Sequence, residues 1–380
     1  ISFGDENIEP SSIQRTLHHG QKFILLKDNS IGVITDEWLD KYGVIFKHGK
    51  IQKGELIVPQ WILLSIEEKH QSKELKPVIS DEWWADWEKW QKSAEPLIPV
   101  PQGLQATLRP YQQKGFEWLV LLGKLNAGGC LADDMGLGKT LQAIAFLQHV
   151  TNQTPTARHL IVAPLSLVFN WKQELEKFAP GLTPYVFHQN NRDIAEFTAS
   201  GKTVMITSYG TLRSAIEELS LVQWNTVIID ESHNIKNQTA QITKAVYRLS
   251  AHNRVALSGT PVMNNTFDIY SQLNFLLPGL LGGAEFFKRE YAIPIDRDMS
   301  VEKTNALQKI TAPFVLRRTK KQVAADLPEK TESVLWCQMD EPQKDVYESI
   351  KKQIKSNVFL DIERDGLSKA KFSILQGILK

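Results

Sequence analysis

The chain has 380 residues, more than one compact core normally holds, so two or three domains are expected. Apolar residues make up 42% and charged residues 23%, as in an ordinary soluble protein, and the formal net charge of +1 gives no global nucleic-acid signal. The presence of only two cysteines excludes a disulfide framework and a four-cysteine zinc site, and it fits a reducing cytoplasm.

No apolar run approaches the roughly 18 residues of a membrane span, and no basic-then-apolar leader opens the chain. The sequence therefore predicts a cytoplasmic protein with no membrane partner. Because the first residue is Ile1 and not methionine, we expect the chain to be a piece of a longer polypeptide.

Residues 1–95 are expected to form a small, separate α+β domain. Two short strands are predicted within residues 22–28 and 30–35, around a hairpin-like Asn-Ser turn. No pattern in this segment carries chemistry. The proline-rich stretch at residues 95–101 has neither helical nor strand periodicity, and it is interpreted as a stiff linker.

A helix is predicted at residues 81–90, ahead of the linker. Its tryptophans lie at helical spacing, which is typical of a buried stripe that docks a helix on a neighbouring domain. A stacking platform for nucleic acid is the alternative, since lysines lie nearby. The buried stripe is preferred. It consists of Trp83, Trp84, Trp87 and Trp90.

Residues 132–140, Ala-Asp-Asp-Met-Gly-Leu-Gly-Lys-Thr, form a glycine-rich turn before a predicted helix at 141–150. Such a turn exposes backbone N–H groups to an anion, and the helix dipole adds partial positive charge. Lys139 is suited to nucleotide phosphates and the Thr140 hydroxyl to Mg²⁺. The strict phosphate-loop pattern asks for glycine where Asp133 stands, so the turn alone leaves an ordinary strand-to-helix connection open.

A further nucleotide contact is predicted upstream, where the sequence Arg-Pro-Tyr-Gln begins a helix. The planar amide of Gln112 can donate to N7 of adenine and accept from N6. Alone, Gln112 is no stronger a candidate than an exposed helical glutamine. Its place ahead of the glycine-rich turn is what favours it.

From that turn onward, short apolar strands alternate with helices, and each strand ends in a polar cluster. Near-continuous apolar strands with helical crossovers predict an α/β fold with a parallel sheet buried on both faces. Ligands of such sheets bind outside the carboxyl ends of the strands. Strands are predicted at residues 160–163, 204–208, 227–229 and 254–257, with a helix at 167–178 after the first.

Asp230 directly follows Val-Ile-Ile, where the acid of a phosphate-loop ATPase meets Mg²⁺, and Glu231 is suited to orient the attacking water. A solvated acidic turn is the alternative. His233 has no partner at metal-ligand spacing, so a linking role is expected. Ser258 lacks the Gly-x-Ser-x-Gly elbow of a nucleophile, and together with Thr260 it is assigned a coupling role.

In their order, these segments resemble the first lobe of a Swi/Snf-type ATPase of helicase superfamily two. The resemblance extends over about residues 104–380 and implies a RecA-like phosphate-loop fold with a helical protrusion on its C-terminal side. Residues 1–95 resemble, more weakly, an accessory segment of bacterial members. The segments that carry the resemblance are 109–112, 134–140, 163–171, 207–209, 230–233 and 258–261, with 314–320 and 327–330 as the passage out of the lobe.

The resemblance implies ATP and Mg²⁺ as cofactors. Lys139, Asp230 and Glu231 would be the catalytic residues, and Asp230 with Thr140 would hold the metal. The residues implied in ATP binding are Arg109, Gln112, Asp134, Met135, Gly136, Leu137, Gly138, Lys139 and Thr140.

The family moves along double-stranded DNA and remodels bound protein, which implies duplex DNA, DNA-bound proteins and a second RecA-like lobe as partners, in a nucleoid-associated, cytoplasmic setting. Trp171 would also line the DNA track, although core packing is the alternative for it and for Tyr209. Asn234 stands where the family often has arginine, which weakens a basic contact there. The implied DNA contacts are Pro164, Ser166, Asn170, Thr207, Ser208, Tyr209 and Lys236.

The expected domains are an accessory domain at 1–95, a first RecA-like lobe at 96–265, a helical protrusion at 266–325 and the start of a second lobe at 326–380. A strand at 331–337 and a helix at 343–357 are predicted in the last part. Without the arginine of a second lobe, which is worth roughly 10³ to 10⁵ in rate, slow turnover is expected. An RNA helicase and a nucleotide-binding regulatory or scaffold module stay open as alternatives.

Overall fold

The computed structural model describes most of the chain from residue 2 to residue 323, together with 336, 338–366 and 375. The chain forms two compact units, residues 1–325 and 326–380, and each is described by itself. No helix among the described residues is long and apolar enough to cross a membrane. Within residues 2–323 the description leaves out 4–5, 19–20, 27, 29, 36–37, 40–41, 44, 47–48, 53–54, 58–63, 65–79, 94, 189–191 and 260–264.

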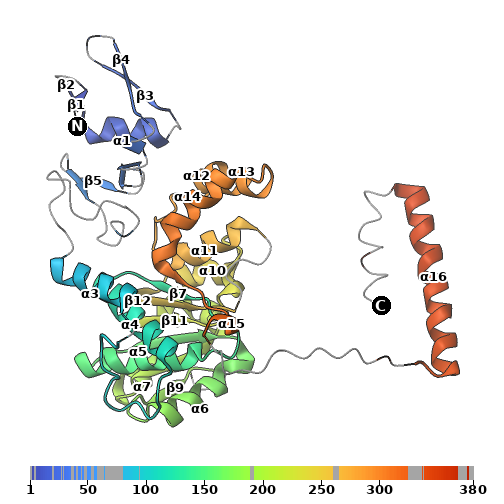
Figure 1. Ribbon diagram of the computed structural model, residues 1–380. Helices are drawn as coiled ribbons and strands as arrows, with labels where there is room; N and C mark the ends of the chain where they lie inside the picture. Colours follow the sequence, from blue (N-terminus) through green and yellow to red (C-terminus); the bar gives the residue numbers. More distant parts are fainter. Residues whose placement is uncertain are drawn as a thin grey trace. The chain divides into compact units, whose positions relative to one another are not determined.

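A seven-stranded parallel sheet forms the centre of the first unit (Figure 1), in the order β13-β7-β12-β11-β8-β10-β9. Its central strands are buried on both faces, because helices cover each side. The predicted α/β fold is therefore confirmed. The strands are β7 (Gly129–Leu131), β8 (His159–Ala163), β9 (Pro184–Val186), β10 (Val204–Ser208), β11 (Gln223–Ile229), β12 (Ser250–Leu257) and β13 (Val315–Leu316).

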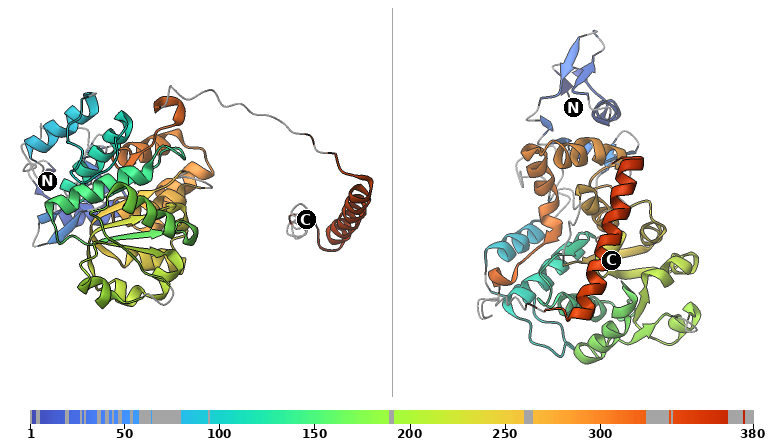
Figure 2. Two further views of the ribbon diagram at one scale, coloured as in Figure 1. Left: turned by 90° about the horizontal axis from the view of Figure 1, so that it is seen from below. Right: turned by 90° about the vertical axis from the view of Figure 1, so that its right-hand side faces the viewer.

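The helices of this unit form a layer on each side of the sheet (Figure 2). The chain moves outward from β7 through β8 to β9 and then returns through β10 and β11 to β12. Because parallel crossovers are right-handed, the outward and returning helices lie on opposite faces. These helices are α4 (Pro110–Lys124), α5 (Lys139–Gln153), α6 (Val168–Phe178), α7 (Ile194–Ala199), α8 (Tyr209–Ser214), α9 (Ile216–Leu219) and α10 (Gln241–Tyr247).

Short helices follow β12, and an aromatic cluster packs them together. The rings of Tyr270 and Phe287 lie 4.8 Å apart between centroids, and Phe267 contacts both. The predicted helix at 266–277 is confirmed to within one residue. The elements are α11 (Thr266–Leu276), α12 (Ala284–Phe287), a π-helical turn (Lys288–Ala292), α13 (Ile293–Asp296), α14 (Val301–Thr311) and α15 (Lys320–Val323).

The tryptophan helix α3 (Asp81–Lys92) docks on α4, as predicted. The indole nitrogen of Trp83 donates to the carbonyl of Leu121 at 2.9 Å, and the Trp83 and Trp87 rings stack 5.2 Å apart. Both rings are buried, so the alternative of a nucleic-acid stacking platform is wrong for them.

The predicted linker is bound to α4 by one carboxylate. Glu117 is wholly buried, and its Oε1 accepts from the backbone nitrogens of Leu97 at 2.7 Å and Ile98 at 3.2 Å. The amide of Gln113 donates to the same oxygen at 2.9 Å. A residue in the middle of a helix thus fixes the path of the chain that enters the unit.

The N-terminal segment has its own small apolar cluster, which includes Ile13, Ile24 and Phe46. The predicted hairpin is confirmed, with strands shorter than expected. The elements are β1 (Ser2–Phe3), β2 (Glu6–Asn7), α1 (Pro10–His18), β3 (Phe23–Leu25), β4 (Ile31–Val33), β5 (Lys50–Gln52) and β6 (Glu55–Ile57), paired as three two-stranded antiparallel sheets.

The second unit contains a single long helix among its described residues, α16 (Glu341–Asp365). Asp340 caps it by accepting from the backbone nitrogen of Gln343 at 2.8 Å. The helix extends the predicted one at 343–357 at both ends. The strand predicted at 331–337 lies, apart from Trp336, outside the described residues.

Candidate nucleotide site

The phosphate loop, residues 132–138, connects the end of β7 to the start of α5. Met135 and Gly136 are exposed at its rim, and Leu137 is buried beneath them. Parallel strands expose their carboxyl ends at one edge of the sheet, so the loop lies at the same edge as the ends of β8, β10, β11 and β12.

Gly138 ends the loop with φ of +74°, in the left-handed region that favours glycine. A Cβ there would lie 2.4 Å from Nε2 of Gln112, so a larger residue would displace the Gln112 amide from its present position. That Nε2 donates to the carbonyl of Leu137 at 3.2 Å, while Oε1 accepts from the backbone nitrogen of Arg109 at 2.9 Å. The predicted adenine-reading amide is thus positioned directly against the loop.

Lys139, the first residue of α5, lies half-buried beside the loop. Its Nζ donates to the carbonyls of Asp133 at 2.7 Å and Asp134 at 3.3 Å. Burial lowers the pKa of Lys139, and the carboxylates of Asp133, Glu231 and Asp230 oppose this shift. The ammonium therefore interacts electrostatically with the acids that follow β11, as a single nucleotide site requires.

The carboxylate of Asp230 is hydrogen-bonded on both oxygens. Trp171 donates its indole N–H to Oδ2 at 2.8 Å, and the backbone nitrogen of Glu231 donates to Oδ1 at 2.8 Å. Burial raises the pKa of Asp230, and the Trp171 hydrogen bond acts against that rise. These contacts fix the carboxylate at the end of β11.

Glu231 adopts a left-handed backbone conformation with φ of +48°, which is uncommon for a residue with a Cβ. Its Oε2 lies 3.2 Å from Nδ1 of His233, and its carbonyl accepts from the side-chain amide of Asn234 at 2.8 Å. Strained backbone of this kind concentrates at functional sites. The linking role of His233 stays a prediction.

Asp230 and the Thr140 hydroxyl are the groups that would hold Mg²⁺. This ion usually takes one or two carboxylates together with substrate phosphates and water, so a small protein ligand set suits it. No cluster of three or more His, Cys, Asp or Glu side chains in the described part of the chain forms a protein-only metal site. The half-buried carboxylate of Asp230, within electrostatic reach of Lys139, therefore fits a metal that binds with its nucleotide.

Three predicted DNA contacts are buried, and the prediction that their side chains line a DNA track is corrected here. Thr207 donates to the carbonyl of Phe187 at 3.0 Å, and the Ser208 hydroxyl caps the first turn of α8. The Tyr209 hydroxyl donates to the carbonyl of Asp230 at 2.7 Å, and burial raises its pKa well above the ordinary value. The Tyr209 side chain therefore joins the ends of β10 and β11, whereas Thr207 bonds to the residue that follows β9 and Ser208 bonds within α8.

Trp171 is likewise buried, which confirms core packing for its ring and adds the contact with Asp230. The remaining predicted DNA contacts differ in exposure. Ser166, Asn170 and Lys236 are exposed, and Pro164 is half-buried. They follow β8 and β11, which are neighbours in the sheet. They stay candidates for contact with a phosphate backbone.

The predicted coupling segment at the end of β12 lies next to β7. Ser258 is buried, and its backbone nitrogen donates to the carbonyl of Leu131 at 3.0 Å. A contact that the sequence did not predict joins the segment after β11 to α11. The Ser232 hydroxyl donates to Oε1 of Gln272 at 2.8 Å. Thr260 lies outside the described residues, so its role stays a prediction.

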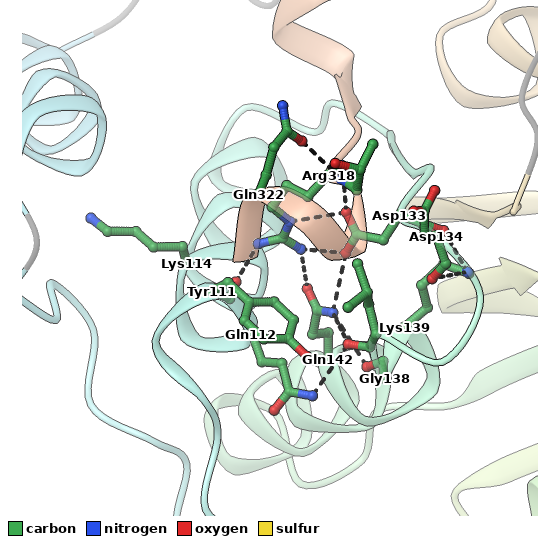
Figure 3. Close-up of polar contacts among 12 residues, drawn as sticks. Tyr111, Gln112, Lys114, Asp133, Asp134, Gly138, Lys139, Gln142, Arg318 and Gln322 are labelled. Atoms are coloured by element: carbon green, nitrogen blue, oxygen red, sulfur yellow. Dashed lines mark hydrogen bonds and ion pairs between the residues drawn. The ribbon is translucent and has the colours of Figure 1, made fainter. Parts of the chain in front are cut away.

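The sequence interpretation missed Arg318, which forms a buried ion pair with Asp133 (Figure 3). Asp133 occupies the position at which the strict phosphate-loop pattern has glycine. A charged residue right after a buried strand needs a partner of opposite charge, and this was a signal available in the sequence. The sequence also held a signal for Arg318. It follows Val315 and Leu316, one more short apolar run that ends in polar residues, as the other strands do.

Residues 111–380 match the SNF2-related domain. The matched segment contains the phosphate loop, the Asp230–Glu231 pair and Arg318. It therefore covers every element of the candidate site apart from Arg109.

Curated relatives share the domain within longer chains. YwqA of Bacillus subtilis (strain 168), described as a putative ATP-dependent helicase/translocase, is 40% identical over 266 residues, which cover 68% of this chain and 28% of the relative. The TATA-binding protein-associated factor MOT1 of Saccharomyces cerevisiae is 34% identical over 304 residues, 73% of this chain and 16% of its own. The chain thus spans less than a third of either relative.

A solved structure agrees in sequence and in fold. The SWI2/SNF2 ATPase core of Sulfolobus solfataricus in complex with double-stranded DNA is 39% identical, with a TM-score of 0.57, over 74% of this chain and 59% of that one. The parallel sheet flanked by helices is therefore the RecA-like arrangement that the sequence predicts. The chain belongs to the SNF2-related family, as a helicase-like ATPase domain.

Proposed function

We propose that this domain is the ATP-binding and ATP-hydrolysing motor lobe of a double-stranded-DNA translocase that remodels protein–DNA complexes. One observation carries the proposal. At a single edge of the sheet, Lys139 interacts with Asp230 and Glu231, and exposed Ser166 and Asn170 follow the strand beside β11. Nucleotide chemistry and a candidate DNA track are thus side by side.

The phosphate loop would bind the triphosphate. Its backbone N–H groups and the start of α5 favour an anion, and Lys139 adds a full positive charge near the outer phosphates. Gln112 would bind adenine through its amide, with Arg109 at the same helix start. Because Gln112 lies against Gly138, the group that binds the base would be held at a fixed position relative to the loop that binds the phosphates.

Glu231 is the proposed general base. Its carboxylate, in contact with His233, would orient the attacking water and accept its proton. Asp230, held by Trp171 and by its own neighbouring backbone, would present an oxygen to the metal together with Thr140. A Mg²⁺ ion held by these two residues would supply positive charge that offsets the negative charge developing in phosphoryl transfer.

Duplex DNA and DNA-bound protein are the proposed partners. The Sulfolobus structure is a complex with double-stranded DNA, and MOT1 is named as a TATA-binding protein-associated factor, which supports both partners by family relationship. Ser166, Asn170 and Lys236 carry a hydroxyl, an amide and an ammonium group, which contact phosphates without reading bases. Binding should tolerate changes of sequence and weaken as salt rises.

We also propose that a second RecA-like lobe in a longer protein completes the ATP site. The chain spans 28% of YwqA, which leaves room for such a lobe in that relative. An arginine supplied to the transferring phosphate is worth roughly 10³ to 10⁵ in rate. Residues 1–380 alone should therefore bind nucleotide and hydrolyse it slowly.

Two substitutions test the motor assignment. Lys139→Ala should weaken ATP binding about tenfold or more, because it removes a charged hydrogen-bond donor to the phosphates. Glu231→Gln should leave binding nearly unchanged and lower hydrolysis by roughly 10² to 10⁴, because it removes the general base. Lys172→Ala is the matched control, since Lys172 is a partly exposed lysine on α6. Binding is measured on this chain and hydrolysis on the protein that carries its second lobe.

The nucleic acid in the assay decides between the proposal and its rivals. Stimulation of hydrolysis by duplex DNA is expected. Stimulation by RNA alone would indicate an RNA helicase, and nucleotide binding without turnover under all conditions would indicate a regulatory module. Hydrolysis that both variants leave intact would contradict the proposed site.

A further inference from the structure

Residues 315–320, here called the exit segment, run along the phosphate loop as an added strand. β13 pairs in parallel with β7, and the pairing continues into the loop, where the backbone nitrogen of Asp134 donates to the carbonyl of Arg318 at 3.0 Å. The backbone nitrogen of Lys320 donates to Oδ2 of Asp134 at 3.0 Å. In sequence, the exit segment precedes the second unit.

Arg318 binds the loop through a fork of charge-assisted hydrogen bonds (Figure 3). Its backbone nitrogen and Nε donate to Oδ1 of Asp133 at 3.0 and 2.9 Å, and Nη2 donates to Oδ2. The carboxylate is wholly buried, and the arginine side chain is 12% exposed. Bidentate pairs of this kind are directional as well as strong.

The same guanidinium reaches the two helices that flank the loop. Nη2 donates to Oε1 of Gln142 on α5 at 2.7 Å, and Nη1 donates to the carbonyl of Tyr111 on α4. Gly115 provides the space, because a Cβ there would lie 1.9 Å from Oε1 of Gln142. One side chain thus connects the exit segment, the loop, α4 and α5.

Asp133 joins this network to the nucleotide-binding lysine. Its carboxylate accepts from Arg318, while its backbone carbonyl accepts from Nζ of Lys139 at 2.7 Å. A buried carboxylate depends on its cation, since an unpaired buried charge is costly. The position of Asp133, and with it the shape of the loop around Lys139, therefore depends on Arg318.

We propose that Arg318 is a positioning residue for the phosphate loop, so that nucleotide affinity depends on the exit segment being bound along the loop. The inference rests on the proposed nucleotide site and adds to it a dependence on the exit segment. Binding of the exit segment along the loop and binding of nucleotide are linked equilibria. If the bound exit segment raises nucleotide affinity by some factor, nucleotide must raise the equilibrium constant for binding of the exit segment by the same factor. The aspartate that replaces the expected glycine is what creates this connection.

The reciprocal effect is measured first, on the unmodified chain. Hydrogen exchange of the backbone amides of Asp134 and Arg318 is followed with and without saturating ADP and Mg²⁺. Both amides take part in the contacts between loop and exit segment, so exchange should slow when nucleotide binds. Unchanged exchange at both amides, with ADP binding demonstrated in the same sample, would overturn the inference.

Arg318→Gln is the second test, with the exposed neighbour Arg317→Gln as the matched control. The dissociation constant for ADP with Mg²⁺ should rise about fivefold or more for Arg318→Gln, within the usual range of coupling between sites, and stay unchanged for Arg317→Gln. The rise in Tm on adding ADP should shrink for Arg318→Gln. A purely structural role would lower the Tm of the unliganded chain and leave that rise intact.

A double variant keeps the test decisive if Arg318→Gln does not fold. Asp133→Asn/Arg318→Gln removes both charges, so it leaves no unpaired buried ion and should fold, yet it lacks the bidentate fork. Its ADP affinity should also fall. Wild-type affinity in the folded double variant would overturn the role of Arg318. Absence of ADP binding by the wild-type chain would instead refute the proposed nucleotide site itself.

Discussion

Trp171 contributes a single hydrogen bond to the acidic end of β11. Its indole N–H donates to Oδ2 of Asp230 at 2.8 Å, and the ring is buried. The ring packs on the core whether or not the N–H finds an acceptor, so the two contributions can be separated. Phenylalanine keeps most of the apolar surface and removes the donor.

Trp171→Phe should weaken the apparent affinity for Mg²⁺ roughly tenfold, because a hydrogen bond to a charged group contributes about 1.5–3 kcal/mol. The measurement is a Mg²⁺ titration of ATP binding. Trp224→Phe is the matched control, since Trp224 is equally buried and donates to the carbonyl of Leu219, away from the site. Equal Mg²⁺ affinities in the two variants would show that the Trp171 hydrogen bond does not orient Asp230.

For single residues, the sequence indicated which chemical groups lie at the sheet edge, but it did not indicate which way each side chain points. Lys139 and Asp230 could be predicted because a glycine turn before a helix and an acid after an apolar strand each fix a position at the sheet edge. Thr207 and Tyr209 were placed on a DNA track, whereas their hydroxyls bond within the lobe. A residue type does not reveal which way its side chain points when both faces of a strand are buried.

The packing of α4 against α5 depends on Gly115. A Cβ at this position would lie 1.9 Å from Oε1 of Gln142 and 2.8 Å from Nη2 of Arg318. Gly115→Ala should therefore lower the free energy of unfolding by about 1–3 kcal/mol, as overpacking does, and outweigh the gain in helix propensity. Chemical denaturation measures the change.

Gly210→Ala in α8 is the control for that substitution. Its Cβ would have Ser208 Oγ as its nearest neighbour, at 3.9 Å, so the helix should be unchanged or gain up to about 1 kcal/mol. If Gly115→Ala were as stable as Gly210→Ala, the space between α4 and α5 would not be as tightly filled as the contacts indicate.

Among the elements, a continuous apolar pattern decided what could be predicted. The longer strands β11 and β12 were predicted only over their apolar ends, 227–229 and 254–257. β8, β10 and α6 were predicted almost to the residue, because five or more residues carry a clear apolar pattern. β9 has three residues and β13 has two, and neither offers enough sequence for periodicity. These short strands form because neighbouring strands supply their hydrogen bonds, which is tertiary information.

The stability of the whole first unit should depend on pH through His159. This residue begins β8 and is wholly buried, and Nε2 lies 2.9 Å from Oγ1 of Thr151. Nδ1 has no partner among the described atoms. Burial lowers the pKa of His159 from 6.5 to about 3.

Between these values the unfolded chain binds a proton that the folded chain excludes. The free energy of unfolding should therefore fall as pH decreases from 6.5 towards 3, by up to about 1.4 kcal/mol per pH unit from this residue. Urea denaturation across this range measures the slope. His159→Gln should make it shallower, with the exposed His252→Gln as control, and parallel profiles would contradict the assignment.

The organisation of the whole chain was harder to predict than its motifs. Residues 95–101 were interpreted as a linker, yet Leu97 and Ile98 are bound by the buried carboxylate of Glu117. The helix that carries Glu117 gave no sign of this, because a charged residue in an apolar helix can face solvent or a partner equally well. Only the folded neighbourhood of the helix decides between them.

β13 is the outermost strand beside β7, and within the sheet it pairs with β7 over two residues. Were it to detach, the outer N–H and C=O groups of β7 would become a template for pairing with another polypeptide. Because the chain leaves the first unit along this edge, self-association is expected whenever β13 detaches. Substitutions that weaken the pairing of β13 with β7 should make aggregation increase with protein concentration. Nucleotide should reduce this aggregation, because its binding stabilises the exit segment.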